Sequence, residues 1–145
     1  MPSAFRVAAG AINPVTGRWM TKTWNFDQVL PVAVETYRAI EQQLGIQVYR
    51  SISEIRFCQN AEDLKRASRR IRNPRYDDVL SRMVAAGKAA PEFNDDFGSF
   101  HIEQAAYVDL PLVVHTLRAS FAALGLFLDE TFLHSELQST AIGWQ

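Results

Sequence analysis

Histidine and glutamate repeat twice at a spacing of two residues, an arrangement that could support proton transfer or metal binding. One pair is His101 with Glu103, and the other is His134 with Glu136. Residues two apart on a strand share a face, so each pair would present an imidazole beside a carboxylate. Two ligands do not complete a zinc site, and neither an HxH nor an HExxH motif occurs. We therefore expect no metal site, and His101 with Glu103 stands as one hypothesis for hydrolase or isomerase chemistry.

The other side chains with potential for catalysis have structural interpretations. The lone cysteine, Cys58, falls near the end of an expected strand with no histidine beside it, which favours a buried thiol over a nucleophile. His115 lies beside the apolar stripe of a helix, and we expect it to be partly buried. Adjacent acidic residues point to opposite faces of a strand, so they predict a flexible acidic loop and a polar strand end instead of a carboxylate pair. These acidic pairs are Asp95 with Asp96 and Asp129 with Glu130.

Six of the 15 basic residues fall within a short stretch of the chain, which could form a patch facing phosphate or acidic groups. We interpret the stretch as a solvated helix face, because no aromatic residues interleave with the arginines and acidic residues precede them. This basic run consists of Lys65, Arg66, Arg69, Arg70, Arg72 and Arg75. Neither GxGxxG nor GxxxxGK[ST] occurs, so the chain carries no glycine-rich phosphate loop.

The apolar pattern predicts the elements that position these residues. Periodic apolar residues predict helices, β-branched and aromatic runs predict strands, and Asn-Pro and Thr-Gly predict turns. We expect an extended piece over 5–12 and a tight loop over 13–18. We expect helices over 27–44, 60–71, 76–83 and 109–124. The expected N-caps of the first, second and fourth helices are Asp27, Asn60 and Asp109. We expect strands over 46–58, whether one bent strand or two, over 97–103 with a continuation at 106–108, and over 126–133. A loop spans 84–96.

Helices separate the strands without strict βαβ alternation, which favours an α+β fold with a small mixed or antiparallel sheet and helices packed on one face. The chain has 145 residues, a hydrophobic content of 48% and a net charge of −1. That composition is typical of one globular core and argues against a disordered chain or a dedicated nucleic-acid binder. No apolar stretch has the length of a membrane span, and the N-terminus lacks the pattern of a signal peptide. We therefore expect a cytoplasmic protein.

The first residues resemble a segment of a known enzyme family. Residues 6–18 read Arg-Val-Ala-Ala-Gly-Ala-Ile-Asn-Pro-Val-Thr-Gly-Arg, and Lys22-Thr23-Trp24 follows. This stretch is similar to the "S-x-x-A-x-G-x-I-x-P" segment of FAD-dependent oxidoreductases of the D-amino-acid oxidase and glycine oxidase superfamily. Later elements resemble the substrate domain of that family in order and spacing, including Ala106-Tyr107-Val108-Asp109 before a helix. The resemblance covers the middle of the family's chain.

The resemblance implies a division of the chain and a set of cofactor contacts. Residues 1–24 would be a flavin-loop-like segment, and residues 25–145 would be a single substrate-domain-like unit. The residues implied to lie against FAD are Ala8, Ala9, Gly10, Ile12, Asn13 and Arg18. The substrate would be an amine or amino acid. Because the dinucleotide-binding GxGxxG is absent, we expect this chain to bind FAD weakly and to be inactive alone.

A second hypothesis treats the chain as a small stand-alone ligand-binding or interaction module. The exposed apolar segment near its N-terminus would then join two copies into a homodimer.

Overall fold

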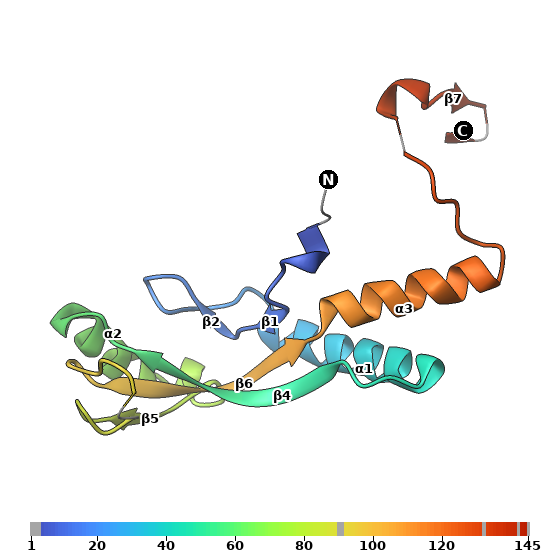
Figure 1. Ribbon diagram of the computed structural model, residues 1–145. Coiled ribbons are helices and arrows are strands. Elements are labelled where there is room, and N and C mark those ends of the chain that lie inside the picture. The colour runs from blue at the N-terminus through green and yellow to red at the C-terminus, as the bar shows by residue number, and fades with distance from the viewer. Residues whose placement is uncertain (1–3, 90–91, 132, 142, 145) are drawn as a thin grey trace.

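A computed structural model describes residues 4–89, 92–131, 133–141 and 143–144 (Figure 1). Expectations that involve residues 1–3, 90–91, 132, 142 and 145 lie outside these described residues. The helices are α1 (Phe26–Leu44), α2 (Ala61–Ile71) and α3 (Leu110–Ala123), with short 3-10 turns η1 (Ala4–Arg6), η2 (Pro74–Tyr76) and η3 (His134–Glu136). The strands are β1 (Ala11–Ile12), β2 (Val15–Thr16), β3 (Thr21–Lys22), β4 (Tyr49–Phe57), β5 (Leu80–Val84), β6 (Ser99–Val108), β7 (Ser139–Thr140) and β8 (Gly143–Trp144). Three helices with antiparallel sheets confirm the α+β class.

The long strand β6 is the centre of the main sheet. β4 pairs along one side of β6, while β1 and β5 pair along the other, and every pairing is antiparallel. Gln104 has a φ of 57° where the register between β4 and β6 shifts. The expected strands over 97–103 and 106–108 are therefore one strand with a bulge, which increases its local twist.

Two of the three predicted helix N-caps are confirmed. The Asn60 side chain accepts a hydrogen bond from the Asp63 N–H at 2.9 Å, and Asp109 accepts one from the Leu112 N–H at 3.0 Å. The predicted cap at Asp27 is wrong, because α1 begins at Phe26 after Asn25, which has a φ of 53° and makes no side-chain cap bond. Pro31 consequently lies inside α1, where its ring removes one intrahelical hydrogen bond.

Two other expected elements are also wrong. Residues 76–83 form no helix, since the chain makes the turn η2 and then strand β5, which gains hydrogen-bonded partners on β6. Residues 126–131 and 133 form no strand, because no other described strand lies alongside them. Figure 1 shows this segment leading away from the sheet beyond α3. An alternating apolar pattern makes a strand only where a partner edge is available.

The core has two clusters along the sheet, and α1 contributes to both. One cluster gathers residues of the β2–β3 hairpin, α1, α2, β5 and β6, and includes Met20, Phe26 and Phe100. The other joins the start of β4, the end of β6 and α3, and includes Val108. Ile12 packs against both clusters, so β1 lies where they meet.

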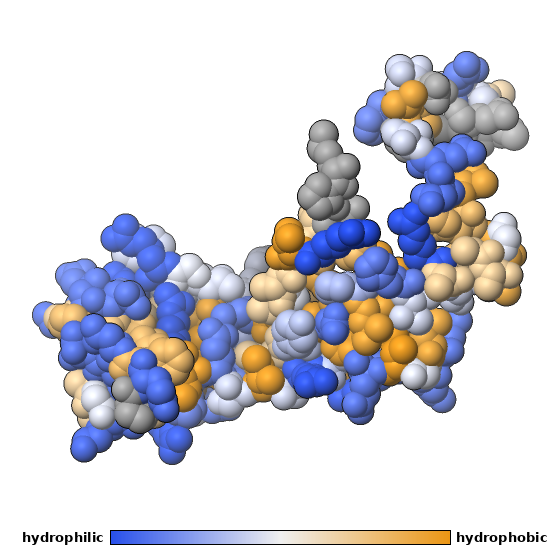
Figure 2. Space-filling view, in the orientation of Figure 1, coloured by the Kyte–Doolittle hydropathy of each residue, from blue (hydrophilic) through white to orange (hydrophobic). Residues whose placement is uncertain are grey.

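Large apolar side chains remain on the surface outside this core. Val7 is 83% exposed, Trp24 is 86% exposed and Leu128 is 79% exposed. Figure 2 shows apolar residues gathered below and along α3 in the right-hand part of the view, whereas the opposite end is mostly hydrophilic. Contiguous exposed apolar surface commonly marks an interaction or ligand site.

Candidate functional site

The segment that leads into β1 presents small side chains and backbone to the surface. Val7, Ala8 and Ala9 are exposed and follow the short turn η1. Within the described residues, neither Ala8 nor Ala9 donates a backbone hydrogen bond. An open run of small residues permits a flat group to approach the backbone closely, as the resemblance implies for Ala8 and Ala9.

Gly10 is needed by the fold itself. Its φ is +67°, and a Cβ built on it would lie 1.9 Å from the Val108 carbonyl oxygen. The Gly10 carbonyl oxygen accepts a hydrogen bond from the Val108 N–H at 2.9 Å. Glycine here allows β1 to approach β6, so strand packing alone accounts for a glycine at this position.

Ile12 and Asn13, also implied to contact a cofactor, are engaged within the fold. Ile12 pairs with Ala106 across the ladder. The Asn13 side chain donates to the Glu54 carboxylate at 3.0 Å and accepts from the Val15 N–H at 2.9 Å. Asn13 therefore shapes the turn into the β2–β3 hairpin, in agreement with its place before proline.

An open, mainly apolar cleft of about 480 Å³ lies between this region and α1. Ile12 and Asn13 line one side of it, and Phe26 and Tyr37 line the other. Trp24 lies at the cleft and is 86% exposed. A volume of several hundred Å³ with few polar groups is typical of a small-molecule site. Two of the six residues implied to contact a cofactor, Ile12 and Asn13, thus line this cleft.

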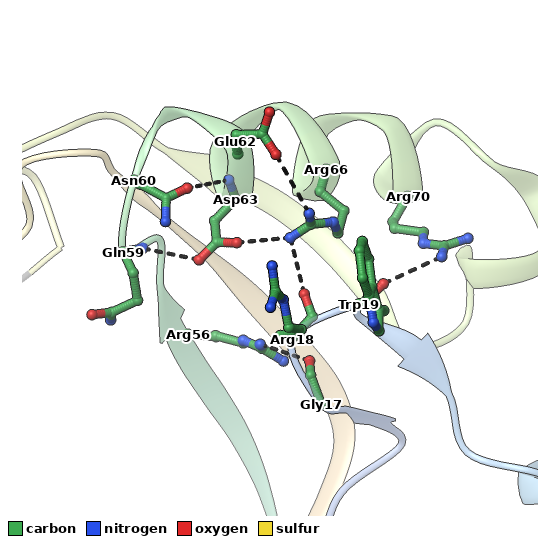
Figure 3. Close-up of polar contacts among 10 residues, drawn as sticks. All are labelled: Gly17, Arg18, Trp19, Arg56, Gln59, Asn60, Glu62, Asp63, Arg66 and Arg70. Carbon is green, nitrogen blue, oxygen red and sulfur yellow. Dashed lines mark hydrogen bonds and ion pairs between the residues drawn. The ribbon is translucent and has the colours of Figure 1, made fainter.

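Arginine side chains of β4 and α2 bind the tip of the β2–β3 hairpin (Figure 3). Three successive carbonyl oxygens, those of residues 17–19, each accept a guanidinium hydrogen bond. Arg56 donates to the first at 2.9 Å, Arg66 to the second at 2.9 Å and Arg70 to the third at 3.2 Å. The expectation that the basic run is only a solvated helix face is therefore wrong for Arg66 and Arg70, which bind the hairpin.

Arg18 lies at this hairpin tip, whereas Ala8 and Ala9 belong to the segment before β1. Its guanidinium carbon lies 5.0 Å from the centre of the Trp19 ring, and that of Arg66 lies 4.8 Å from the same ring. Arg18 also lines an open pocket of about 520 Å³ with the first turn of α2. The structure therefore divides the implied cofactor residues between the segment before β1, the cleft and the hairpin tip.

Lys22 bridges two elements through a pair of aspartates. Its ammonium group lies 2.7 Å from the Asp27 carboxylate and 2.9 Å from that of Asp78, and its side chain is only 8% exposed. Desolvation by burial lowers the pKa of Lys22, but the hydrogen bonds to Asp27 and Asp78 outweigh it and the net pKa is raised. Burial raises the pKa of Asp78 while its bond to Lys22 lowers it, and the net pKa is lowered. No sequence motif relates these residues, so sequence reasoning missed them.

Glu41 caps the start of β4 from inside α1. Its Oε1 atom accepts from the N–H groups of Val48 and Tyr49, both at 2.8 Å, and Arg38 pairs with Oε2. These two backbone hydrogen bonds, opposed by desolvation and assisted by Arg38, lower the pKa of Glu41 to about 2. This carboxylate, which the apolar pattern could not identify, is structural.

The remaining candidates from the sequence have mixed outcomes. Cys58 is buried as expected, and desolvation raises the pKa of its thiol. His115 is exposed, not partly buried, and its ring lies edge-on to that of Phe5 with a centroid distance of 5.4 Å. Asp95 is 4% exposed, so it is not part of a freely solvated acidic loop. Asp129, expected at a strand end, lies in irregular chain and pairs with Arg118.

The two histidine–glutamate pairs differ in structure. His134 and Glu136 belong to the 3-10 turn η3, so they do not share a strand face, and the Glu136 side chain lies outside the described part. His101 and Glu103 do lie on β6, and the Ser81 hydroxyl donates to Glu103 at 2.6 Å. That bond lowers the pKa of Glu103. Among the described residues, no group of three or more His, Cys, Asp or Glu side chains is placed to hold a metal ion.

Comparisons of the chain with protein-family models, with curated proteins and with solved structures found no match. In the described part of the chain, none of the helices combines the length and apolar character required to cross a membrane.

Proposed function

We propose that this chain forms the flavin-contacting segment and substrate domain of an FAD-dependent amino-acid or amine oxidoreductase. The observation that carries the proposal is the exposed run of small residues at Ala8 and Ala9, whose N–H groups bond to no described residue. The adjoining apolar cleft, lined by Ile12 and Asn13, supports it. The proposal rests further on the resemblance of residues 6–18 to the superfamily segment.

The six implied residues fit a flavin to different degrees. Ala8 and Ala9 suit contact with a flat ring, because their side chains are small and exposed. Gly10 and Asn13 would act indirectly, since Gly10 holds β1 against β6 and Asn13 shapes the following turn. Arg18 is exposed and belongs to another element, so it would act from the hairpin tip.

A bound flavin would accept the hydride equivalent from the α-carbon of the substrate. In this proposal the chain orients the ring with the segment before β1 and keeps water from one side of it. These residues would supply only part of the contacts that FAD needs, so we expect the chain alone to be inactive and to bind FAD weakly. We also propose a cytoplasmic location and no nucleic-acid partner, in keeping with the net charge of −1.

Flavin mononucleotide and backbone amide NMR of the full chain test the proposal. We expect added flavin mononucleotide, at millimolar concentration, to shift the amide signals of residues 7–12. The substitution Ala9→Glu should abolish these shifts, whereas Ala39→Glu, at an exposed position of α1, should preserve them. No shift in residues 7–12, or equal loss in both variants, would contradict the proposal. FAD binding at micromolar affinity would contradict the expected weakness of the isolated chain.

A second candidate function, a homodimeric ligand-binding or interaction module, is favoured by one observation. Val7 is 83% exposed in the segment before β1, where a second copy could cover it. Sedimentation should then show a dimer that Val7→Asp dissociates and that Val32→Asp, at a 62% exposed position of α1, leaves intact. A monomer at all accessible concentrations would exclude this module.

A further inference from the structure

A pocket with basic side chains lies on the sheet away from the segment before β1. It has a volume of about 380 Å³ and is lined by residues of β4, β5 and β6 and of the loop after β5. His101 of β6 lies opposite Ile55 of β4. On the other side of β6, Arg82 falls between two paired positions of β5. Three adjacent strands therefore contribute side chains to one pocket.

The charge of this pocket is mostly positive. Arg82, Lys88 and His101 all line it, and no carboxylate of the described residues does. Among the described residues, neither Arg82 nor Lys88 forms an ion pair. The nearby carboxylate, Glu103, is hydrogen-bonded to Ser81, and the charges of His101 and Arg82 help to lower its pKa. Basic groups that converge without ion-pair partners attract a small anion.

The backbone that carries Lys88 is held by hydrogen bonds on both sides. The N–H of Gly87 donates to the Asp95 carbonyl oxygen at 3.0 Å, and the N–H of Ala89 donates to Asp95 Oδ2 at 3.1 Å. The Lys88 N–H itself donates to the Ala85 carbonyl oxygen at 3.1 Å. Asp95 is 4% exposed, so these bonds are partly shielded from water. The base of Lys88 is therefore pre-positioned, which reduces the entropy lost when a ligand binds.

The rest of the pocket wall is apolar. Ile55 and Val84 come from the strands, while Ala85 and Ala89 come from the loop. Val84 pairs with Ser99, two residues before His101, so it shares the face of His101. Ile55 is 39% exposed, so it remains available for contact. An anion with an apolar substituent would therefore find a complement for both of its parts, whereas a bare inorganic anion would not.

We propose that this pocket binds a small carboxylate with an apolar substituent. Arg82 and Lys88 pair with the carboxylate, a His101 ring N–H donates to it, and the substituent lies on Ile55 and Val84. The pocket is open, so we expect millimolar affinity that falls as ionic strength rises. The inference is independent of the proposed flavin contact, because none of its residues belongs to the segment before β1 or to the hairpin.

Titration with hexanoate, followed by backbone amide NMR of the full chain, tests this site. We expect saturable shifts that cluster at residues 82–85, 88–89 and 101. The uncharged 1-hexanol and inorganic phosphate should each bind at least about fivefold more weakly, because each lacks one half of the match. If phosphate binds with the same affinity as hexanoate, the assignment of an apolar substituent is overturned.

Matched variants separate a specific site from general charge attraction. Lys88→Gln and Arg82→Gln should each weaken hexanoate binding about fivefold, the effect of one partly solvated ion pair. Lys65→Gln and Arg69→Gln change the net charge equally at exposed positions of α2, and they should leave the affinity unchanged. Equal weakening in the two sets, or no saturable shift at 50 mM hexanoate (roughly tenfold above the expected Kd), would overturn the proposal. Amide spectra of all four variants should superimpose on the wild-type spectrum away from the substituted residue, which confirms folding.

Discussion

Gly10 and Gly17 have the same φ of +67° in different surroundings, so alanine at each position isolates the effect of close packing at β1. An added Cβ at Gly17 meets nothing within 4 Å, whereas one at Gly10 lies 1.9 Å from the Val108 carbonyl oxygen. Both substitutions place an L-residue in the left-handed region, which costs about 1 kcal/mol. The difference between them measures what Gly10 contributes to β1–β6 packing.

The expected magnitude follows from the contact distances. An ordinary Cβ contact begins near 3.4 Å, so the Gly10→Ala chain must move by about 1.5 Å relative to β6. That movement breaks the 2.9 Å hydrogen bond from Val108 to Gly10, which contributes about 1 kcal/mol. It also disturbs the contact of Ile12 with both core clusters, which adds about 1 kcal/mol. We therefore expect Gly10→Ala to cost about 3 kcal/mol and Gly17→Ala about 1 kcal/mol.

Urea unfolding monitored by circular dichroism measures the free energies of unfolding, and hydrogen exchange locates the change. The Val108 amide should exchange faster in Gly10→Ala and at the wild-type rate in Gly17→Ala. If β1 detaches locally, the exchange difference will be large while the global difference is small. Equal free energies of unfolding combined with unchanged Val108 exchange would refute the argument from packing and leave the glycine to be explained by a ligand.

Three other predictions concern charge and burial. Lys22→Met should destabilise the fold by about 1 kcal/mol at neutral pH, whereas the exposed Lys65→Met should not. The folded pKa of Lys22 is raised above 10.5, so this stabilisation is present at lower pH and is lost as the pH rises through the folded pKa. In strong alkali, the free energies of unfolding of both variants, measured in urea, should therefore equal that of the wild type. Cys58 should react with a thiol reagent about 100-fold more slowly in the native chain than in urea, and equal rates would contradict its burial. Arg70→Ala should accelerate tryptic cleavage at the hairpin tip, whereas Arg69→Ala should not. Mass spectrometry of timed digests measures the cleavage rate, and an unchanged rate in Arg70→Ala would contradict this prediction.

The predicted elements that hold are those with local causes. Asn60 and Asp109 cap helices because their side chains reach an N–H three residues away, and that geometry needs no distant partner. The helix predicted to end at residue 44 does so, because Gly45 follows it with a φ of 65°, which a glycine adopts without strain. Cys58, expected near a strand end, directly follows β4 and is 5% exposed.

The elements that fail depended on distant partners. Residues 80–84 are a strand because β6 offers them an edge, while residues 126–131 remain irregular because no other described strand lies beside them. The wrong cap at Asp27 has a local cause instead, because α1 begins one residue earlier, after Asn25. A pattern of apolar residues contains no information on which edge or ion-pair partner will lie nearby.

By itself, the sequence determined the α+β class, two of the helix N-caps, the buried thiol and the run of small residues before β1. Only the tertiary structure decided how those residues are used. It brought Arg56, Arg66 and Arg70 to the hairpin tip and gathered basic side chains of β5, β6 and a loop into one pocket. Short-range hydrogen bonds and turn preferences act over a few residues and can be recognised in the sequence. Contacts between residues far apart in the chain depend on how the strands pair, which the whole fold determines.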